Sequence, residues 1–514
     1  MKNLHLSRYF FLPLVLFSSA FASLPEKSAI VYYGNNISYP IVGIHDYIIV
    51  QPEFTNTHTH GFALYKEKIY AYVSVGEIHS DIKEYKNIQD DWILTTNKAW
   101  NSKVLDIKNP AYMEYFFKEL IEPRRVQGFK NFFFDTLDSY QLVCKTQQER
   151  QESEKALVSF INEFHKRYPD SKLIINRGFE IIDQVHSDLE AVLFESYYEG
   201  IGGEKLAYQR VSDDARNWLD IHLQKIKSYG LNIIALEYLP EDTHIKSAEL
   251  IQKIQKKGMI PYIANRELNI YGKSSKNAIK REIFTLIDTD IEEEITSDAH
   301  RYGTPVFEYM GYIQKIFHVS EPLPSMSEMD KYQGAVIWLT KTYNNPQALI
   351  TWIQQLKKIG IKVAIVGSLP VDVQSNYFET LGIKIIPGIK HKNKILYQDS
   401  MLSYKMKPSM LASNFTIEAK KSKALLIYKH NDASNTTPAA LTEWGGYALE
   451  ESFIMHNNKE NIWVINPFEF FKQALDLPIH SISNQSPQNM KRLLSTHIDR
   501  IMNKIEKKCD IFLL

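Results

Sequence analysis

The chain has 514 residues, of which 44% are hydrophobic and 23% are charged, so it is not a disordered protein but a globular one with room for two or three domains. Lys and Arg together number 60, as do Asp and Glu, so the net charge is zero and gives no electrostatic reason to expect nucleic acid or an anionic membrane as a partner. The two cysteines, Cys144 and Cys509, do not indicate a disulfide framework or a zinc site, although one bridge between them stays open.

Residues 1–22 have the features of a secretory signal peptide. Lys2 and Arg8 supply the positive start, and Ala20-Phe21-Ala22 is a small-x-small cleavage site. We expect this segment to be removed and the protein to be exported to the periplasm or secreted. The alternative is a short membrane anchor, but Pro13 interrupts the apolar run, which is short for a bilayer. No second apolar segment of membrane length follows, so we expect no stable membrane span after signal removal.

Strand-like and helix-like segments alternate from residue 28 to about residue 275. The strand candidates are short, rich in Val, Ile, Tyr or Phe, and apolar on both faces, as is typical of parallel strands covered by helices. They are Ala29–Tyr33, Tyr47–Gln51, Tyr70–Val75, Asn131–Phe134, Lys172–Ile175, Ala191–Phe194, Asn232–Leu236 and Met259–Ala264. Helical patterns cover 111–126, 148–168, 214–229 and 245–257, while the first two connections are the least clear. The pattern predicts a (β/α)₈ TIM-type barrel over residues 28–275.

Polar residues follow the apolar strands, at the end of such a barrel where active sites lie. Asp135 and Asp138 follow the fourth strand and Glu195 follows the sixth. Side chains of alternate strands share a layer of the barrel, so we expect Asp135 and Glu195 to face one pocket. Glycoside hydrolysis uses such a pair, with one carboxyl group protonating the leaving oxygen and the other attacking carbon or activating water.

The other polar residues at strand ends allow structural interpretations too. Glu77 could pair with Arg177 or Arg266, and Asp138 could cap the next helix. Asn176 and Arg177 could form a structural corner instead of binding a ligand. Glu237 could face the outer helices instead of the pocket. No His joins the acids at ligand spacing, so we expect no metal.

Five segments in chain order resemble glycoside hydrolase family 114, the endo-α-1,4-polygalactosaminidase barrels. They are Tyr70-Ala-Tyr-Val-Ser-Val-Gly-Glu77, Phe134-Asp-Thr-Leu-Asp-Ser-Tyr140, Asn176-Arg-Gly-Phe179, Glu195-Ser-Tyr-Tyr198 and Ile260-Pro-Tyr-Ile263. The resemblance covers about residues 28–275 and implies hydrolysis of α-1,4-linked galactosamine or N-acetylgalactosamine chains. It implies Glu195 as the acid/base and Asp135 as its partner, with Asp138 as the alternative because the motif holds both. We favour a retaining course, which the carboxyl separation would distinguish from an inverting one.

The second half has a different periodicity. Segments at 333–339, 345–359, 362–366, 376–381 and 383–386 alternate strand and helix, which predicts a small open α/β domain of flavodoxin or Rossmann type over residues 300–390. Gly367-Ser-Leu-Pro370 is a weak phosphate-loop candidate, so we expect no nucleotide and no other cofactor. Residues 391–514 are predicted to be rich in β-structure.

Two late segments resemble Pel-polysaccharide hydrolase/deacetylase proteins, where the hydrolase half leads into a deacetylase. They are Trp463-Val-Ile-Asn-Pro-Phe468 and Arg492-Leu-Leu-Ser-Thr-His-Ile-Asp499. Arg500 and Ile501 depart from the Gly-Asp continuation of that family, so we expect only a truncated deacetylase-like start. A separate deacetylase or exopolysaccharide export machinery is then an expected partner.

These observations predict an exported, endo-acting glycosidase that cuts an amino-sugar exopolysaccharide with Asp135, Asp138 and Glu195. The expected substrate-binding residues are Tyr33, Glu77, Tyr140, Asn176, Arg177, Tyr197, Tyr238 and Arg266. One alternative is a polysaccharide-binding or assembly module without turnover. Another is a redox or nucleotide site in the open α/β domain, which the missing fingerprint disfavours.

Overall fold

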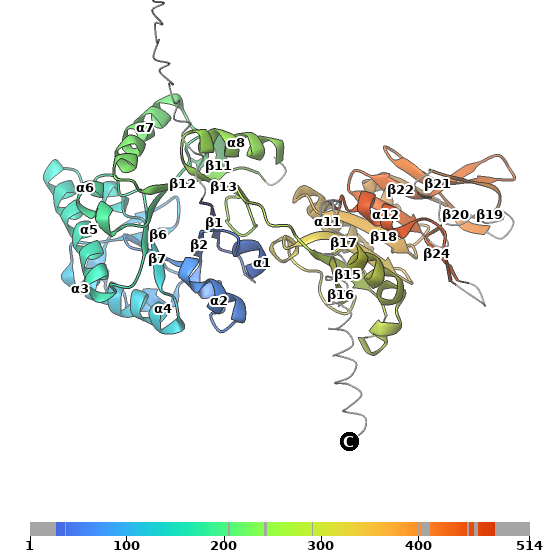
Figure 1. The fold of residues 1–514 in the computed structure, drawn as a ribbon, viewed down its shortest axis with the longest axis horizontal. Coiled ribbons are helices and arrows are strands. Elements are labelled where there is room, and N and C mark those ends of the chain that lie inside the picture. The colour runs from blue at the N-terminus through green and yellow to red at the C-terminus, as the bar shows by residue number, and fades with distance from the viewer. Residues whose placement is uncertain are drawn as a thin grey trace, which may run out of the picture. The chain divides into compact units, whose positions relative to one another are not determined.

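The structure is a computed structural model, and it describes residues 27–478 except 36, 204–205, 241–243, 290, 399–400, 402–411, 450–451 and 457–460. The signal-peptide and deacetylase-like predictions, at 1–22 and 492–499, lie outside the described residues. The chain divides into two compact units (Figure 1). The first runs to Lys280 and also takes in 324–331 and 358–360, and the second holds the remainder.

The first unit is built on eight parallel strands, each within one or two residues of its predicted position. They are β1 (Ala29–Tyr32), β2 (Tyr47–Val50), β3 (Ile69–Ser74), β7 (Asn131–Asp135), β8 (Leu173–Asn176), β9 (Ala191–Glu195), β12 (Asn232–Tyr238) and β13 (Ile260–Ala264). They pair in that order, and a short antiparallel strand β14 (Lys273–Ser274) follows β13. The Tyr33 N–H donates to the Leu268 carbonyl at 2.7 Å, which links the two ends of the sheet. The sheet is therefore nearly closed, as expected for a TIM-type barrel.

Helices cover the outside of this sheet (Figure 1). They are α1 (Tyr39–Val42), α2 (His60–Tyr65), α3 (Pro110–Tyr115), α4 (Glu122–Gln127), α5 (Gln147–Arg167), α6 (Ile182–Val185), α7 (Asp213–Ser228) and α8 (His244–Lys256), with a π-helical turn at Phe116–Ile121 joining α3 to α4. The α5 helix shows why they form. Thr146 and Glu149 make a reciprocal capping box at its start, and its apolar side chains face the sheet. Phe164 packs edge-on against Phe134 of β7, with ring centroids 5.1 Å apart.

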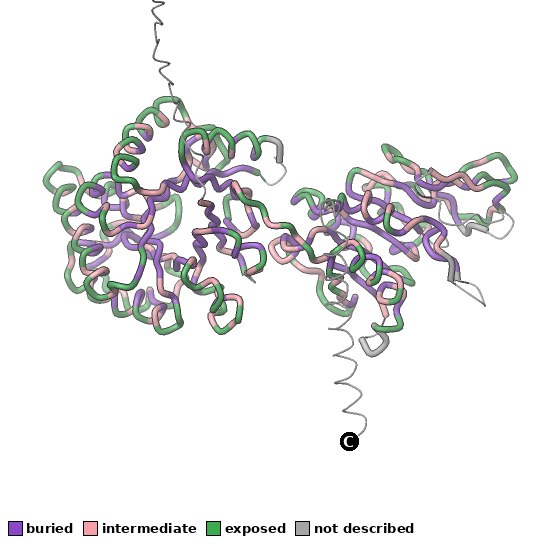
Figure 2. The backbone as a smooth tube through the Cα atoms, viewed as in Figure 1, coloured by how far each residue is buried: buried purple, intermediate pink, exposed green. Residues whose placement is uncertain are grey.

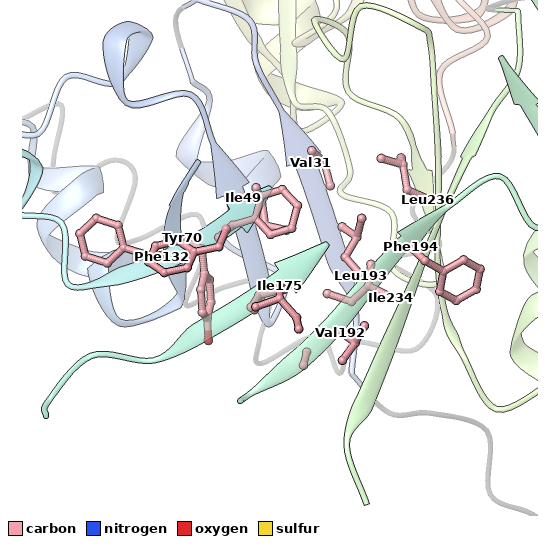
Figure 3. Close-up of a cluster of buried hydrophobic side chains, with 14 of the residues drawn as sticks. Val31, Ile49, Tyr70, Phe132, Ile175, Val192, Leu193, Phe194, Ile234 and Leu236 are labelled. Atoms are coloured by element: carbon pink, nitrogen blue, oxygen red, sulfur yellow. The ribbon is translucent and has the colours of Figure 1, made fainter. Parts of the chain in front are cut away.

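The barrel core is almost entirely apolar. The strands are buried along nearly their whole length, while the covering helices alternate buried and exposed residues (Figure 2). Figure 3 shows apolar side chains from several strands together, among them Ile175 of β8 and Leu193 of β9. Both are at most 1% exposed. Burial on both faces explains why these strands are apolar runs in the sequence.

Two insertions that the sequence patterns did not predict stand near the carboxyl ends of the strands. After β3 the chain forms a three-stranded antiparallel sheet of β4 (Glu77–His79), β5 (Ile93–Asn97) and β6 (Ser102–Leu105). After β9 it forms a hairpin of β10 (Glu199–Gly202) and β11 (Ala207–Arg210). Both are short and mostly polar, so neither has the apolar pattern by which the barrel strands are found.

The second unit contains one nine-stranded sheet. In spatial order the strands are β16 (Ile313–His318), β15 (Glu282–Ile287), β17 (Tyr332–Leu339), β18 (Lys362–Gly367), β23 (Gly445–Leu449), β22 (Asn435–Thr442), β21 (Lys423–His430), β19 (Ile383–Tyr397) and β20 (Ala412–Ala419). The first five are parallel and the rest antiparallel. The residues predicted as an open α/β domain and those predicted as a β-rich segment therefore share one sheet, which begins at β15, before residue 300.

Helices and a small two-stranded sheet accompany this nine-stranded sheet. They are α9 (Thr304–Tyr309), α10 (Met326–Met329), α11 (Pro346–Lys358), α12 (Pro467–Ala474), β24 (Ile454–His456) and β25 (Asn461–Trp463). The segment predicted as a helix at 376–381 is a 3₁₀ turn, Tyr377–Leu381. A flavodoxin-like identity for this unit stays a prediction.

Candidate active site

Asp135, Asn176 and Glu195 end three adjacent strands of the barrel: β7, β8 and β9. The side-chain nitrogen of Asn176 donates to Asp135 Oδ1 at 2.7 Å and to Glu195 Oε1 at 2.9 Å. The two accepting oxygens therefore lie at most about 5.6 Å apart, which is the sum of these two distances. The two predicted carboxyl groups lie close together, and one amide donates to both.

The second oxygen of each carboxyl group is held by a tyrosine. Tyr72 of β3 donates to Asp135 Oδ2 at 3.0 Å, and Tyr238 of β12 donates to Glu195 Oε2 at 2.6 Å. Tyr33 packs edge-on against Tyr72, with ring centroids 5.3 Å apart. Burial and the nearby charges of Asp135 and Glu195 raise the pKa of all three tyrosines well above 10, so they stay neutral donors.

The surroundings of Asp135 keep a proton on its carboxyl group to an unusually high pH. Burial, followed by repulsion from Glu195, raises the pKa of Asp135 from 3.8 to about 6. The hydrogen bonds from Asn176 and Tyr72 oppose this rise because they stabilise the ionised form.

Each of the three strands ends in a left-handed corner. Thr136, Arg177 and Ser196 directly follow the three polar residues and have φ values of 62°, 58° and 64°. Such conformations cost about 1–3 kcal/mol for residues other than glycine and persist only where the surroundings impose them. Here Thr136 is braced by its hydroxyl, which accepts from the Gly76 N–H at 2.9 Å and contacts the Ser74 hydroxyl at 2.8 Å. The corners end the strands directly after the polar side chains.

Asp138 and Arg177 stand apart from the pair. Their side chains are 40% and 37% exposed and face each other at 3.7 Å. Asp138 makes no capping hydrogen bond to the following turn, so the capping interpretation is not seen. Of the two acids in the fourth-strand motif, Asp135 is the one that Asn176 connects to Glu195.

Three other predicted binding residues have partners away from the two carboxyl groups. Tyr140 donates to Glu154 of α5 at 3.3 Å, and Tyr197 donates to Asp220 of α7 at 2.5 Å. The exposed Arg266 guanidinium pairs with its neighbour Glu267 at 2.8 Å. The two tyrosines therefore point toward the helical layer.

Glu77 is buried in a polar network of the β4–β6 insertion. It accepts hydrogen bonds from Asn97 at 3.0 Å, from Ser139 at 2.6 Å and from Ser102. The expected pairing with Arg177 or Arg266 is not found. Glu77 instead connects the insertion to the turn that follows Asp135.

Two contributors were not among the predicted site residues. Tyr72 lies two residues before Ser74, the last residue of β3, so the two side chains share one face of the strand. Ser74 pairs in register with Asp135 and Tyr72 pairs with Phe133, and the shared face was the available signal that Tyr72 lies near Asp135. Glu237, which the sequence placed at a strand end with its direction left open, is fully buried and accepts hydrogen bonds from three successive backbone N–H groups, those of Tyr197, Tyr198 and Glu199. Burial raises its pKa from 4.5 to about 7.

The residues that the structure describes contain no group of three or more His, Cys, Asp or Glu side chains placed to hold a metal ion. Within the same residues no helix is long and apolar enough to cross a bilayer. Cys144 is a free thiol, and Cys509 lies outside the described part of the chain.

Comparisons with known proteins give matches to solved structures and to one family model. No curated protein sequence matches the chain. The glycoside hydrolase domain of PelA from Pseudomonas aeruginosa is a solved structure with 28% identity and a TM-score of 0.45, covering 48% of this chain and 98% of that domain. Aspergillus fumigatus Ega3, solved in complex with galactosamine, has 15% identity and a TM-score of 0.38, covering 48% of this chain and 93% of that one. The family model of glycoside-hydrolase family GH114 matches residues 50–280, which confirms over that segment the family resemblance that the ordered motifs indicated.

Proposed function

We propose that the protein is an exported, endo-acting glycoside hydrolase that cleaves an exopolysaccharide rich in α-1,4-linked galactosamine or N-acetylgalactosamine. The observation that carries the proposal is the single amide of Asn176 that holds Asp135 and Glu195 together at the end of the barrel. The GH114 match over this segment supports the reaction class, and the family resemblance supports the substrate class. Export is proposed from the signal-like residues 1–22.

The proposed mechanism is retaining. Glu195 protonates the leaving glycosidic oxygen while Asp135 attacks the anomeric carbon, which gives a covalent glycosyl-enzyme intermediate. Glu195 then takes a proton from water, which hydrolyses the intermediate and restores both carboxyl groups. The two bridged oxygens lie at most about 5.6 Å apart, which is compatible with the close carboxyl groups of a retaining enzyme. Asn176, Tyr72 and Tyr238 orient the two acids in this scheme.

Asp135, not Asp138, is the proposed partner of Glu195. The Asp135 carboxylate is bridged to Glu195 and its pKa is raised, whereas Asp138 is more exposed and faces Arg177. Arg177 and Asp138 are proposed to contact sugar residues at the rim. Their contribution is expected to be to binding and not to bond cleavage.

One assay tests the proposal. Purified protein is incubated with partially deacetylated α-1,4-galactosaminogalactan, and new reducing ends are measured for the parent chain and for Glu195→Gln, Asp135→Asn and Asp138→Asn. We expect release by the parent, loss of at least about 10³-fold in the first two variants, and a smaller loss in the third. Binding without release by the parent would support a polysaccharide-binding module instead. Stereochemistry of the first product by NMR separates the retaining from the inverting course.

A further inference from the structure

The last two residues of β12, Glu237 and Tyr238, contact Glu195 and the three residues Tyr197–Glu199 that follow it. Side chains alternate along a strand, so Glu237 and Tyr238 point in opposite directions. Tyr238 donates its hydroxyl to Glu195 Oε2 at 2.6 Å. Glu237 accepts from the backbone of the residues that follow Glu195. Strand β12 therefore contacts both the acid itself and the chain that leads away from it.

The Glu237 carboxylate occupies a backbone nest. Its Oε1 accepts from the Tyr197 N–H at 2.9 Å, and its Oε2 accepts from the N–H groups of Tyr198 at 2.9 Å and Glu199 at 2.6 Å. Successive N–H groups that converge in this way form a concave binding place for an anion. Burying a carboxylate with no solvent exposure costs free energy unless it is hydrogen-bonded. The three backbone donors offset this cost for Glu237.

The nest begins directly after the strained corner at Ser196. Ser196 has a φ of 64° and donates its N–H to the Leu236 carbonyl of β12 at 2.9 Å. A corner of this kind stays in place only where its surroundings over-determine it. The Leu236 carbonyl fixes the near side of the corner and the Glu237 carboxylate fixes the three residues beyond it. Without the carboxylate, the corner would be free to relax, and the Glu195 side chain would turn with it.

We propose that Glu237 is a positioning residue for Glu195: it holds the backbone of Tyr197–Glu199 so that the Glu195 carboxyl group stays at bridging distance from Asp135. The part of this proposal that concerns catalysis rests on the proposed hydrolase function. Glu237 has no contact with the reacting groups. It acts through the corner, and a displacement of about 1 Å in such a group is enough to cost roughly 100-fold in rate.

Asp220 provides a matched control. Its carboxylate holds the same segment from the helical layer, where it accepts from the Tyr197 hydroxyl at 2.5 Å and pairs with Lys257 at 3.1 Å. Asp220→Asn therefore makes the same acid-to-amide change against the same residue, but through a side chain and not through the backbone. If any weakening of the contacts to Tyr197–Glu199 lowered the rate, Glu237→Gln and Asp220→Asn would both lower it.

The first test needs no activity. Amide hydrogen exchange is measured for the peptide that contains residues 196–199 in the full-length parent, Glu237→Gln and Asp220→Asn. Gln presents an NH₂ group where one carboxylate oxygen accepted a bond, so we expect exchange at least 10-fold faster at Tyr197–Glu199 in Glu237→Gln and within 2-fold of the parent in Asp220→Asn. Equal exchange in the parent and Glu237→Gln would overturn the proposal, whether or not the protein is a hydrolase.

The second test separates positioning from stability. We expect Glu237→Gln to lower kcat by 10- to 100-fold with KM changed less than 3-fold, and Asp220→Asn to leave kcat within 2-fold of the parent. Glu237→Asp keeps the charge and is expected to recover part of the lost kcat. It also serves as the test variant if the Gln variant does not fold. A parent that releases no reducing ends refutes the proposed function, and the exchange result then decides the backbone role alone. Unchanged kcat in both Glu237 variants, or equal losses in Asp220→Asn, refutes positioning.

Discussion

Asp135 and Glu195 both accept a hydrogen bond from the side-chain nitrogen of Asn176, so one amide positions both carboxyl groups. It also favours the ionised form of Asp135, against burial and the charge of Glu195. Asn176 therefore affects the geometry of both carboxyl groups and the pKa of Asp135.

Replacing Asn176 by Ala is expected to lower kcat/KM by roughly 100-fold, the order seen when one oriented donor is removed from an active site. Because the lost hydrogen bond lowered the pKa of Asp135, and Asp135 attacks in its ionised form, the limb of the pH profile at low pH should also move to higher pH. Both effects are measured from kcat/KM across pH 4–9. Asp138→Asn is the control, since Asp138 does not contact Asn176 in the structure and should not move the limb. An unshifted limb in Asn176→Ala would show that the amide does not tune the pair.

Activity of the parent enzyme is expected to rise as pH rises through about 6. In the proposed mechanism Asp135 attacks the anomeric carbon in its ionised form, and its pKa is raised to about 6. The tyrosines that face the pair, Tyr33, Tyr72 and Tyr238, stay neutral through this range because their pKa values lie well above 10. The measurement is kcat/KM from pH 4 to 9 at constant ionic strength. Equal activity at pH 4 and pH 7 would contradict the assignment of Asp135 as the nucleophile.

Stability should fall over a similar pH range. Asp135 and Glu237 have pKa values raised by burial from 3.8 to about 6 and from 4.5 to about 7, so the folded state binds protons more tightly than the unfolded state. Their contribution is therefore fully present below about pH 4 and is lost as pH rises through about 7. Asp135→Asn removes one ionisable group. Between pH 4 and pH 8 its free energy of unfolding should therefore gain on the order of 2 kcal/mol relative to that of the parent. Urea unfolding of the parent and of Asp135→Asn at pH 4 and pH 8 checks this. An equal difference in the free energy of unfolding between the two proteins at both pH values would contradict it.

The barrel could be predicted because its strands are buried on both faces. Runs such as Asn131–Phe134 and Ala191–Phe194 have no polar interruption until the site residue, so both the strand and its functional end are visible in the sequence. Asp135 and Glu195 were found in this way. The prediction weakens immediately after each strand, because a left-handed corner changes the side to which the next residues point.

The sequence did not indicate the positions of three residues, Tyr197, Glu77 and Tyr72, and each has its own structural reason. Tyr197 follows Glu195 by two positions and would share its face if the strand continued, but it points to α7 instead. Glu77 lies just after a strand too, but its direction is set by the β4–β6 insertion, whose polar strands carry no apolar pattern. Tyr72 lies inside a strand, and its role depends on the distance to Asp135, which only the register between β3 and β7 determines.

Gly76→Ala should damage the site through the corner at Thr136. Gly76 lies in the turn after β3, and a Cβ there would stand 2.4 Å from the Thr136 carbonyl oxygen, so the backbone that follows Asp135 must move. We expect a loss of about 1–3 kcal/mol in the free energy of unfolding, as for other overpacked sites, together with a fall of at least 10-fold in kcat. Gly230→Ala is the matched control. Gly230 has a φ of 73° with no atom within 4 Å of the added Cβ, so that variant should lose about 1 kcal/mol of stability and keep its kcat. Equal kcat in the two variants would show that the Thr136 corner does not hold Asp135 in place.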